Sequence, residues 1–205
     1  MLHNDNVQEG PTSRQAQRLR TRERVLDAAI VEFQRAGTDS ADINAIVEAA
    51  GVARSTFYFH FPTKEHVLLE LIRRDEARLA EELSRFLDTP HDLPAVLHTI
   101  TDLVLALESR WGEALFRDVI SLYFSRVEDE HWTRHPVFVL LAAEIERSRN
   151  RGELYDDVDA YYSAGFFLAG VYAALLSTAS QASSDRHGVL AMFVRSSLRG
   201  LQPPA

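Results

Sequence analysis

Residues 42–65, DINAIVEAAGVARSTFYFHFPTKE, bring together the side chains of this chain best suited to contact nucleic acid. Hydroxyls, a phenol and positive charges stand close together here, and they include Lys64, the only lysine among 22 basic residues. The stretch predicts two short helices around a glycine turn, followed at once by the start of a third helix. In a helix–turn–helix of this kind the second helix can enter the DNA major groove while its flanks contact phosphates. Control of transcription is therefore the leading hypothesis.

The spacing of apolar residues predicts the helices that must hold this stretch. A first helix is expected from Ser13 to Ala36, with apolar positions at Leu19, Val25, Leu26, Ala29, Ile30 and Phe33. Gly37 would end it with a left-handed cap. Asp42 suits the N-cap of a second helix, and Gly51 then turns the chain. The inward positions of that second helix are Ile43, Ile46, Val47 and Ala50.

The turn leads into a third helix, expected over 54–60, with Phe57 and Phe61 facing the core. Pro62 ends this helix, because proline lacks a backbone N–H and restricts the residue before it. Thr63 would cap a long fourth helix over 64–87. Its apolar side carries Val67, Leu68, Leu71, Ile72, Leu79, Leu83 and Phe86.

The rest of the chain keeps the helical pattern and shows no alternating strand pattern. Further helices are predicted over 94–109, 112–126, 136–151, 158–180 and 185–200. The expected fold is all-α with nine helices. We expect a disordered arm over 1–12, a helix–turn–helix domain over 13–78 with its motif at about 41–60, and a second helical domain over 79–205.

The net charge of −8 is distributed unevenly between these parts. Residues 1–74 hold 10 basic and 10 acidic side chains, whereas residues 75–205 hold 12 basic and 20 acidic ones. Within 14–24 five arginines face a single acid, Glu23. Local charge matters more than the total to a phosphate backbone. The distribution indicates a DNA-facing end and an acidic body.

Composition also bears on the compartment. The chain has no cysteine, which excludes disulfides and suits a reducing cytoplasm. The polar N-terminus is not a secretory signal. The apolar run over 160–182 nearly reaches the roughly 20 residues of a membrane span. Its tyrosines, serines and glycines favour a buried helix instead, so we expect a cytoplasmic protein without a membrane segment.

Residues 18–70 resemble the N-terminal domain of the TetR family of bacterial regulators. The match includes RERVLDAAIVEFQRAG in the first helix, IVEAAGVARSTFY across the turn and FHFPTKEHVL into the fourth helix. More weakly, RNRGELYDDVD at 149–159 is similar to the stretch before the penultimate helix of many members. Two positions depart from the family: Asp42 stands where threonine is usual, and Ala53 where serine is usual. The first would cap a helix yet repel DNA, and the second removes a capping hydroxyl.

The resemblance implies roles for individual residues at the DNA end. Base readout falls to Arg54, Ser55 and Thr56, whose guanidinium and hydroxyls suit base edges or phosphate. Tyr58 and Lys64 resemble phosphate clamps, and Lys64 also stands at a helix N-terminus that favours anions. His60 would add a phosphate contact, and Phe59 a contact with a thymine methyl. The alternative is that Tyr58 and His60 are merely half-buried and Lys64 is solvated.

The five arginines of the first helix leave two interpretations open. Side chains 14, 18, 20, 22 and 24 could follow the DNA backbone or enter the minor groove. Alternatively they form a solvated helix face.

A short recognition helix reads few base pairs, so such proteins usually act as two-fold dimers. The resemblance places the dimer interface in the last two helices, over 158–180 and 185–200. The spacing of small residues there permits close helix approach. The interface candidates are Gly165, Ala169, Gly170, Ala174 and Leu175.

A ligand pocket needs mostly apolar walls, and aromatic residues crowd the middle of the chain. The best candidates to line a pocket for a lipophilic effector are Trp111, Phe116, Tyr123, Phe124 and Phe166. Each is also compatible with plain core packing. His131 and His135 have a spacing that can hold a metal, yet Pro136 disfavours helical geometry there, so no metal or cofactor is expected.

The favoured hypothesis is a homodimeric repressor of operator DNA that a small lipophilic molecule releases, with the fourth helix transmitting the signal. A helical enzyme lacks support, since the sequence has no nucleophile elbow or phosphate loop. A ligand-binding or protein-interaction module with a weak or vestigial DNA head is the other alternative, motivated by Asp42. The sequence leaves the operator, the effector and the choice between repression and activation open.

Overall fold

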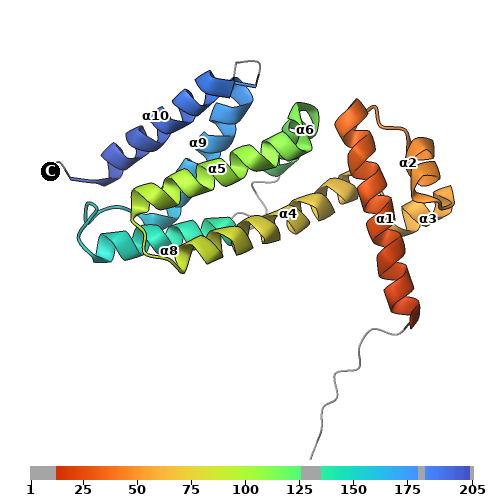
Figure 1. Cartoon of the computed structure of the whole chain (residues 1–205), viewed down its shortest axis with the longest axis horizontal. Coiled ribbons are helices and arrows are strands. Elements are labelled where there is room, and N and C mark those ends of the chain that lie inside the picture. The colour runs from red at the N-terminus through yellow and green to blue at the C-terminus, as the bar shows by residue number, and fades with distance from the viewer. Residues whose placement is uncertain (1–12, 126–134, 180–182, 204–205) are drawn as a thin grey trace, which may run out of the picture. The chain divides into compact units, whose positions relative to one another are not determined.

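A computed structural model describes residues 13–125, 135–179 and 183–203. Within these residues every regular element is a helix, and there are nine of them, as the sequence predicts (Figure 1). The helices are α1 Ser13–Ala36, α2 Ile43–Ala50, α3 Arg54–His60, α4 Lys64–Leu87, α5 Leu93–Trp111, α6 Glu113–Ser125, α8 Pro136–Asn150, α9 Ala160–Ser177 and α10 Ser183–Leu201. The chain divides into two compact units within α4, after Leu71, whereas the sequence suggested a boundary after residue 78.

Local capping chemistry explains where most helices begin and end. Gly37 and Gly51 adopt left-handed backbone angles, with φ of 75° and 61°. Asp42 caps α2 by accepting a 2.8 Å hydrogen bond from the backbone N–H of Asn44. Asp159 accepts the Tyr162 N–H at 2.9 Å, so α9 begins at Ala160 rather than two residues earlier.

The first unit is built on α1, which packs against α2 and carries much of the core. Val25, Phe33, Ile46, Phe57 and Phe61 are fully buried, as expected for the inward positions of α1, α2 and α3, whereas Val47 of α2 is only half-buried. Leu19 was expected on the apolar stripe of α1 but is 54% exposed. It precedes the part of α1 whose residues are buried, so no neighbouring helix covers it.

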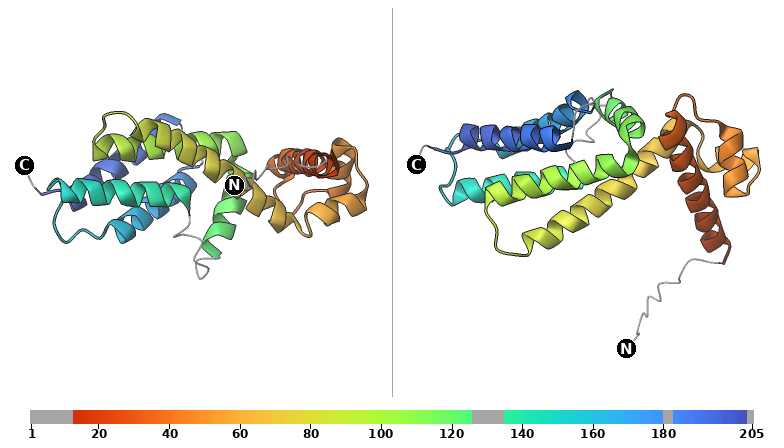
Figure 2. Two further views of the ribbon diagram at one scale, coloured as in Figure 1. Left: turned by 90° about the horizontal axis from the view of Figure 1, so that it is seen from below. Right: turned by 45° about the horizontal axis from the view of Figure 1, so that its top comes forward.

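The second unit is a bundle in which α5 contacts α6, α8, α9 and α10. Figure 2 shows α8, α9 and α10, coloured cyan to blue, alongside the yellow-green α5. Its core is aliphatic around a few aromatic rings, with Leu97, Ile100, Leu141, Val171 and Leu175 at its centre. Burial of such side chains is the main stabilising contribution of a helical bundle.

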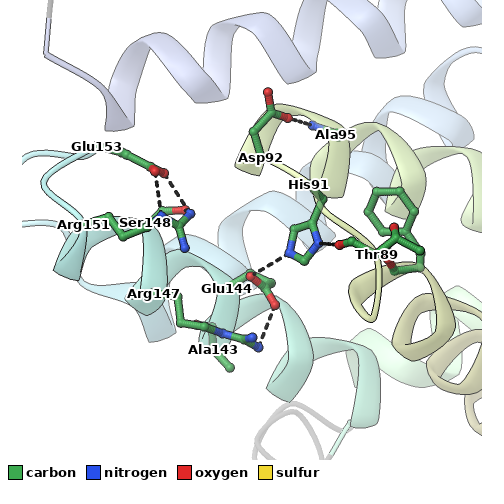
Figure 3. Close-up of polar contacts among 11 residues, drawn as sticks. Thr89, His91, Asp92, Ala95, Ala143, Glu144, Arg147, Ser148, Arg151 and Glu153 are labelled. Carbon is green, nitrogen blue, oxygen red and sulfur yellow. Dashed lines mark hydrogen bonds and ion pairs between the residues drawn. The ribbon is translucent and has the colours of Figure 1, made fainter.

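A polar network joins the turn before α5 to α8 (Figure 3). His91 Nε2 lies 3.3 Å from the buried carboxylate of Glu144, and its Nδ1 donates to the Thr89 carbonyl at 2.6 Å. Arg147 Nη2 lies 2.6 Å from the other Glu144 oxygen. Arg147 therefore pairs with the buried charge of Glu144, and His91 contacts the same carboxylate from the turn, which joins this turn to α8.

The apolar helix α9 is long enough to span a membrane by length and composition alone. One face, with Ala164, Phe167, Leu168, Val171 and Leu175, is buried in the bundle. The prediction of a buried helix therefore holds for that face of α9. Tyr162 and Phe166, on the other face, are exposed. This pattern is typical of a core helix with one uncovered side.

Candidate nucleic-acid interface and C-terminal cavity

The turn between α2 and α3 presents the start of α3 outward. Gly51 donates its N–H to the Glu48 carbonyl at 3.0 Å, and Val52 donates to Val47 at 3.0 Å, which closes α2. No side chain caps α3, in line with Ala53 at its N-cap. Phe57 anchors the helix in the core and leaves one face of α3 to solvent.

Arg54 is held across this turn. Its Nη1 donates to Oδ1 of Asn44 at 2.7 Å, its guanidinium carbon lies 5.7 Å from the Tyr58 ring centroid, and its Nη2 lies 3.4 Å from the Tyr58 hydroxyl. The sequence did not single out Asn44. Its exposed position in the first turn of α2 could have indicated a role at the turn of the motif.

The other residues predicted to contact DNA lie on or beside this face. Ser55, Tyr58 and Phe59 are exposed, and Thr56 is half-buried. Phe59 is 64% exposed, and the Arg18 guanidinium lies 5.1 Å from its ring centroid. An aromatic ring so open to solvent has no part in the core of its unit.

His60 is half-buried at the end of α3, with its ring edge against Phe59. Burial lowers the pKa of His60, and the nearby positive charges of Arg18 and Arg22 lower it further. The free protein therefore holds His60 as a neutral imidazole at neutral pH.

Lys64 differs from the expected free phosphate clamp. Its Nζ donates to the carbonyl oxygens of Thr38 at 2.9 Å and Asp39 at 2.8 Å, in the loop that follows α1. These carbonyls lie beyond the end of a helix, where no helical N–H reaches them. An ammonium has three donors, so Lys64 fixes the loop and keeps one N–H for another acceptor.

Asp42, expected to cap α2 and to repel DNA, is part of a wider network. Its backbone N–H donates to Glu32 Oε1 at 2.9 Å, and Arg35 donates twice to the same carboxylate at 2.7 and 2.8 Å. The hydrogen bonds from Arg35 and Asp42 lower the pKa of Glu32 to about 2. This network joins α1 to the first turn of α2.

The arginines of α1 serve different purposes. Arg22 lies 2.8 Å from Glu70, and its guanidinium stands 4.8 Å from the Phe61 ring centroid, so it holds α1 to α4 within the first unit. Arg18 lies over Phe59. Arg14, Arg20 and Arg24 are exposed.

The second unit contains a small cavity of about 20 Å³. Two of the predicted pocket residues, Trp111 and Tyr123, line it. Phe116 is buried beside it, with ring centroids 6.3 Å from Trp111 and 6.4 Å from Tyr172. The other residues that line the cavity are Ile72, Glu76, Leu79, Leu107, Val119, Ile120, His135 and Tyr172.

Phe124 and Phe166 do not line this cavity. Phe124 is exposed on α6, and Phe166 is 74% exposed on the outer face of α9, where it stacks on Tyr162. Helical periodicity turns position 166 away from the buried positions 164, 168 and 171.

Some of the predicted dimer residues are engaged within the chain itself. A Cβ on Gly170 would lie 2.2 Å from the ring of Phe193 on α10, and Leu175 is fully buried. Gly165 faces Phe138 of α8, while Ala169 and Ala174 are half-buried. Gly165 and Gly170 therefore serve packing inside one chain. The uncovered apolar side chains of the last two helices are Tyr161, Tyr162, Phe166, Leu176 and Met192.

The expected absence of a metal site concerned His131 and His135. His131 lies outside the described residues. His135 is buried, and its Nε2 lies 3.1 Å from Glu76 Oε1. Among the described residues no group of three or more metal-binding side chains occurs.

The fold and the exposed face of α3 define a helix–turn–helix DNA-binding protein of the all-α class. Residues 25–71 match the model of the bacterial regulatory proteins of the tetR family. Over these residues the chain carries the DNA-binding domain of the TetR family of transcriptional regulators.

Individual relatives agree with this assignment. The chain is 33% identical to the HTH-type transcriptional regulator AcrR of Shigella flexneri over 109 residues, which are 53% of this chain and 50% of that protein. It thus spans about half of the length of AcrR. It is 24% identical to the regulator UidR of Escherichia coli (strain K12) over 162 residues, 76% of this chain and 80% of that protein.

The fold is also found in solved structures. The transcriptional regulator FadR from Bacillus subtilis in complex with stearoyl-CoA superposes with a TM-score of 0.63 at 15% identity, covering 86% of this chain and 95% of FadR. At this identity the likeness concerns the fold alone.

Proposed function

We propose that this protein is a homodimeric repressor that binds operator DNA through α3 and leaves it when a small molecule occupies the second unit. The observation that carries the proposal is the outward face of α3. Phe57 anchors the helix in the core, while Arg54 is pinned to Asn44 at 2.7 Å on the open side. A preordered guanidinium of this kind suits bidentate contact with guanine.

Around α3, phosphate contacts would come from Tyr58, His60 and the remaining N–H of Lys64. Arg14, Arg20 and Arg24 are exposed and free to approach the DNA backbone or the minor groove. One carboxylate oxygen of Asp42 accepts the Asn44 N–H. The negative charge of Asp42 remains and would repel DNA phosphates at the edge of the interface.

Dimerisation through α9 and α10 is supported by their uncovered aromatic face. Tyr162 and Phe166 are stacked with centroids 6.3 Å apart, and Leu176 and Met192 are exposed on the same two helices. Exposed apolar side chains concentrated in this way favour a protein–protein interface. A symmetric pair would supply two copies of α3 to a palindromic operator.

Effector control is supported by the position of α4. This one helix contributes residues to both compact units and, through Glu76, to the cavity. Ligand and DNA would then influence each other's affinity through α4, and the coupling is reciprocal. The protein acts by binding rather than by catalysis and works in the cytoplasm.

Fluorescence anisotropy on labelled DNA from the promoter flanking its own gene tests the proposal. We expect tight, salt-sensitive binding, with the slope of log K against log salt near −0.9 for each phosphate contacted. Arg54→Ala with Tyr58→Phe should abolish specific binding, whereas Arg117→Ala on α6, an exposed arginine of the second unit, should not. Absence of salt-sensitive binding would favour a vestigial DNA head instead.

A further inference from the structure

The cavity of the second unit contains a carboxylate, that of Glu76, in mostly apolar and aromatic surroundings. Glu76 is the only carboxylate among the described residues that line it, and none of those residues is lysine or arginine. The Glu76 side chain is 21% exposed, so most of it is removed from solvent. A charge in such a place favours a partner of opposite sign.

His135 is the lining residue that contacts this carboxylate. Its Nδ1 accepts the backbone N–H of Phe138 at 3.4 Å, at the N-cap of α8, which directs Nε2 toward Glu76 Oε1 at 3.1 Å. The carboxylate thus has an imidazole contact, and no lysine or arginine stands beside it among the described lining residues.

Three aromatic rings complete the wall around this charge. The indole Nε1 of Trp111 donates to Asp75 Oδ2 at 2.6 Å, which fixes the orientation of the ring. Tyr123 and Tyr172 lie with centroids 6.2 Å apart. Burial raises the pKa of both phenols, with a further contribution from the charge of Glu76, so both remain neutral. The electron-rich faces of such rings attract cations.

We propose that the cavity is the core of an effector site for lipophilic cations, molecules with an apolar body and a protonated amine. This inference rests on the proposed function, because it names the chemistry of the effector. The ammonium would replace His135 as the donor to Glu76, and the apolar body would displace side chains around Trp111 and Tyr123. A cavity of about 20 Å³ has room for about one water, so the ligand must widen it.

The same arrangement selects against anions. A carboxylate or phosphate head group would face Glu76 without a cationic side chain among the described lining residues. Displacement of His135 would also release the contact that ties the first turn of α8 to α4 inside the second unit. Binding of a cationic ligand would therefore change a contact of α4, the helix that continues into the first unit.

Isothermal titration calorimetry with three probes that share one body tests the inference: 1-naphthylmethylamine, 1-naphthylmethanol and 1-naphthoate. The amine should bind about tenfold tighter than the alcohol, and the carboxylate should bind weakest. Glu76→Gln keeps the shape of the side chain and removes its charge, so it should abolish the preference for the amine. Glu113→Gln, an exposed carboxylate of α6 outside the cavity, should retain it.

Binding of the alcohol by Glu76→Gln, with an unchanged circular dichroism spectrum, shows that the variant is folded. Equal or tighter binding of the carboxylate, a preference for the amine that survives Glu76→Gln, or no binding of any probe would overturn the assignment. The promoter DNA assay separates the two proposals. A protein that binds promoter DNA without preferring the amine refutes the cation site alone, and one that does not bind the DNA refutes the repressor.

Discussion

Arg54 on α3 donates a 2.7 Å hydrogen bond from Nη1 to Oδ1 of Asn44 on α2. The bond crosses the turn of the motif and joins the first residue of the recognition helix to the helix before it. Free arginine side chains lose about 2 kcal/mol of rotamer entropy when they are ordered. In the proposed complex with DNA, Asn44 removes part of that cost in advance and acts as a positioning residue for Arg54.

Asn44→Ala should weaken specific operator binding about five- to tenfold and leave non-specific binding unchanged, because Arg54 stays present but loses its anchor. Anisotropy titrations on operator and scrambled duplexes measure both affinities. A double-mutant cycle with Arg54→Ala is the control, since residues that act through one another give non-additive losses. Additive losses would mean that Asn44 acts independently of Arg54.

His60 should make operator binding sensitive to pH. Its pKa is lowered in the free protein by burial and by Arg18 and Arg22, so it is neutral at neutral pH. A nearby DNA phosphate favours the protonated ring, so binding takes up a proton and affinity should rise as the pH falls from about 8 to about 6. Anisotropy at constant ionic strength measures the trend. His60→Gln should flatten it, and an unchanged slope in that variant would assign the proton to another group.

Glu32 should contribute to the acid stability of the first unit. Its pKa is lowered from 4.5 to about 2, first by the hydrogen bonds of Arg35 and then by that of the Asp42 N–H. A depressed carboxylate pKa stabilises the fold above the unfolded value, and this contribution is lost as the pH falls from 4.5 to about 2.

Urea unfolding followed by circular dichroism checks this prediction. Glu32→Gln should be less stable than the parent protein at pH 7, and the difference should shrink as the pH falls through that window. Glu23→Gln on the same helix, at an exposed position, is the matched control and should behave as the parent does. A difference that persists undiminished at low pH would assign the loss to packing.

The sequence predicted the helices well because their limits depend on neighbouring residues. Gly37, Asp42 and Pro62 act on the backbone next to them, so their effects can be read without a structure. Leu19 was wrongly predicted to be buried, because the spacing of apolar residues does not show how far along α1 the neighbouring helices reach. Lys64 donates to the carbonyls of Thr38 and Asp39, which lie 26 and 25 residues away in the sequence. No local sequence pattern predicts such contacts.

The same limit applied to the second unit. The spacing of small residues marked Gly170 as an interface candidate, and the cluster of aromatic residues marked Phe166 as a pocket candidate. Which face of α9 is buried depends on α8 and α10, which pack against it. In the structure Gly170 packs against Phe193 inside the chain, and Phe166 is uncovered and lines no part of the cavity.

The uncovered face of α9 should hold two chains together. Phe166→Glu places a charge at the most exposed large apolar side chain of the described residues, and burying it in an interface without a partner is costly. We expect a shift from dimer to monomer in sedimentation velocity and a loss of operator binding. Val31→Glu, a comparably exposed apolar position on α1, should remain a dimer. A dimer that survives Phe166→Glu would place the interface elsewhere.

Gly170 should accept a side chain only if the ring of Phe193 moves. A Cβ at position 170 would lie 2.2 and 2.6 Å from two ring atoms of Phe193, which also stacks on Phe167 at 5.5 Å. Gly170→Ala must therefore displace the ring, and we expect about 1–3 kcal/mol of destabilisation in chemical unfolding. Gly188→Ala on α10, where no atom lies within 4 Å of the added Cβ, should instead stabilise by about 0.5–1 kcal/mol.

Phe193→Leu should recover part of the loss in Gly170→Ala, because the two positions share one space and their effects are coupled. Equal losses in the two alanine variants would show that α9 and α10 do not pack at Gly170.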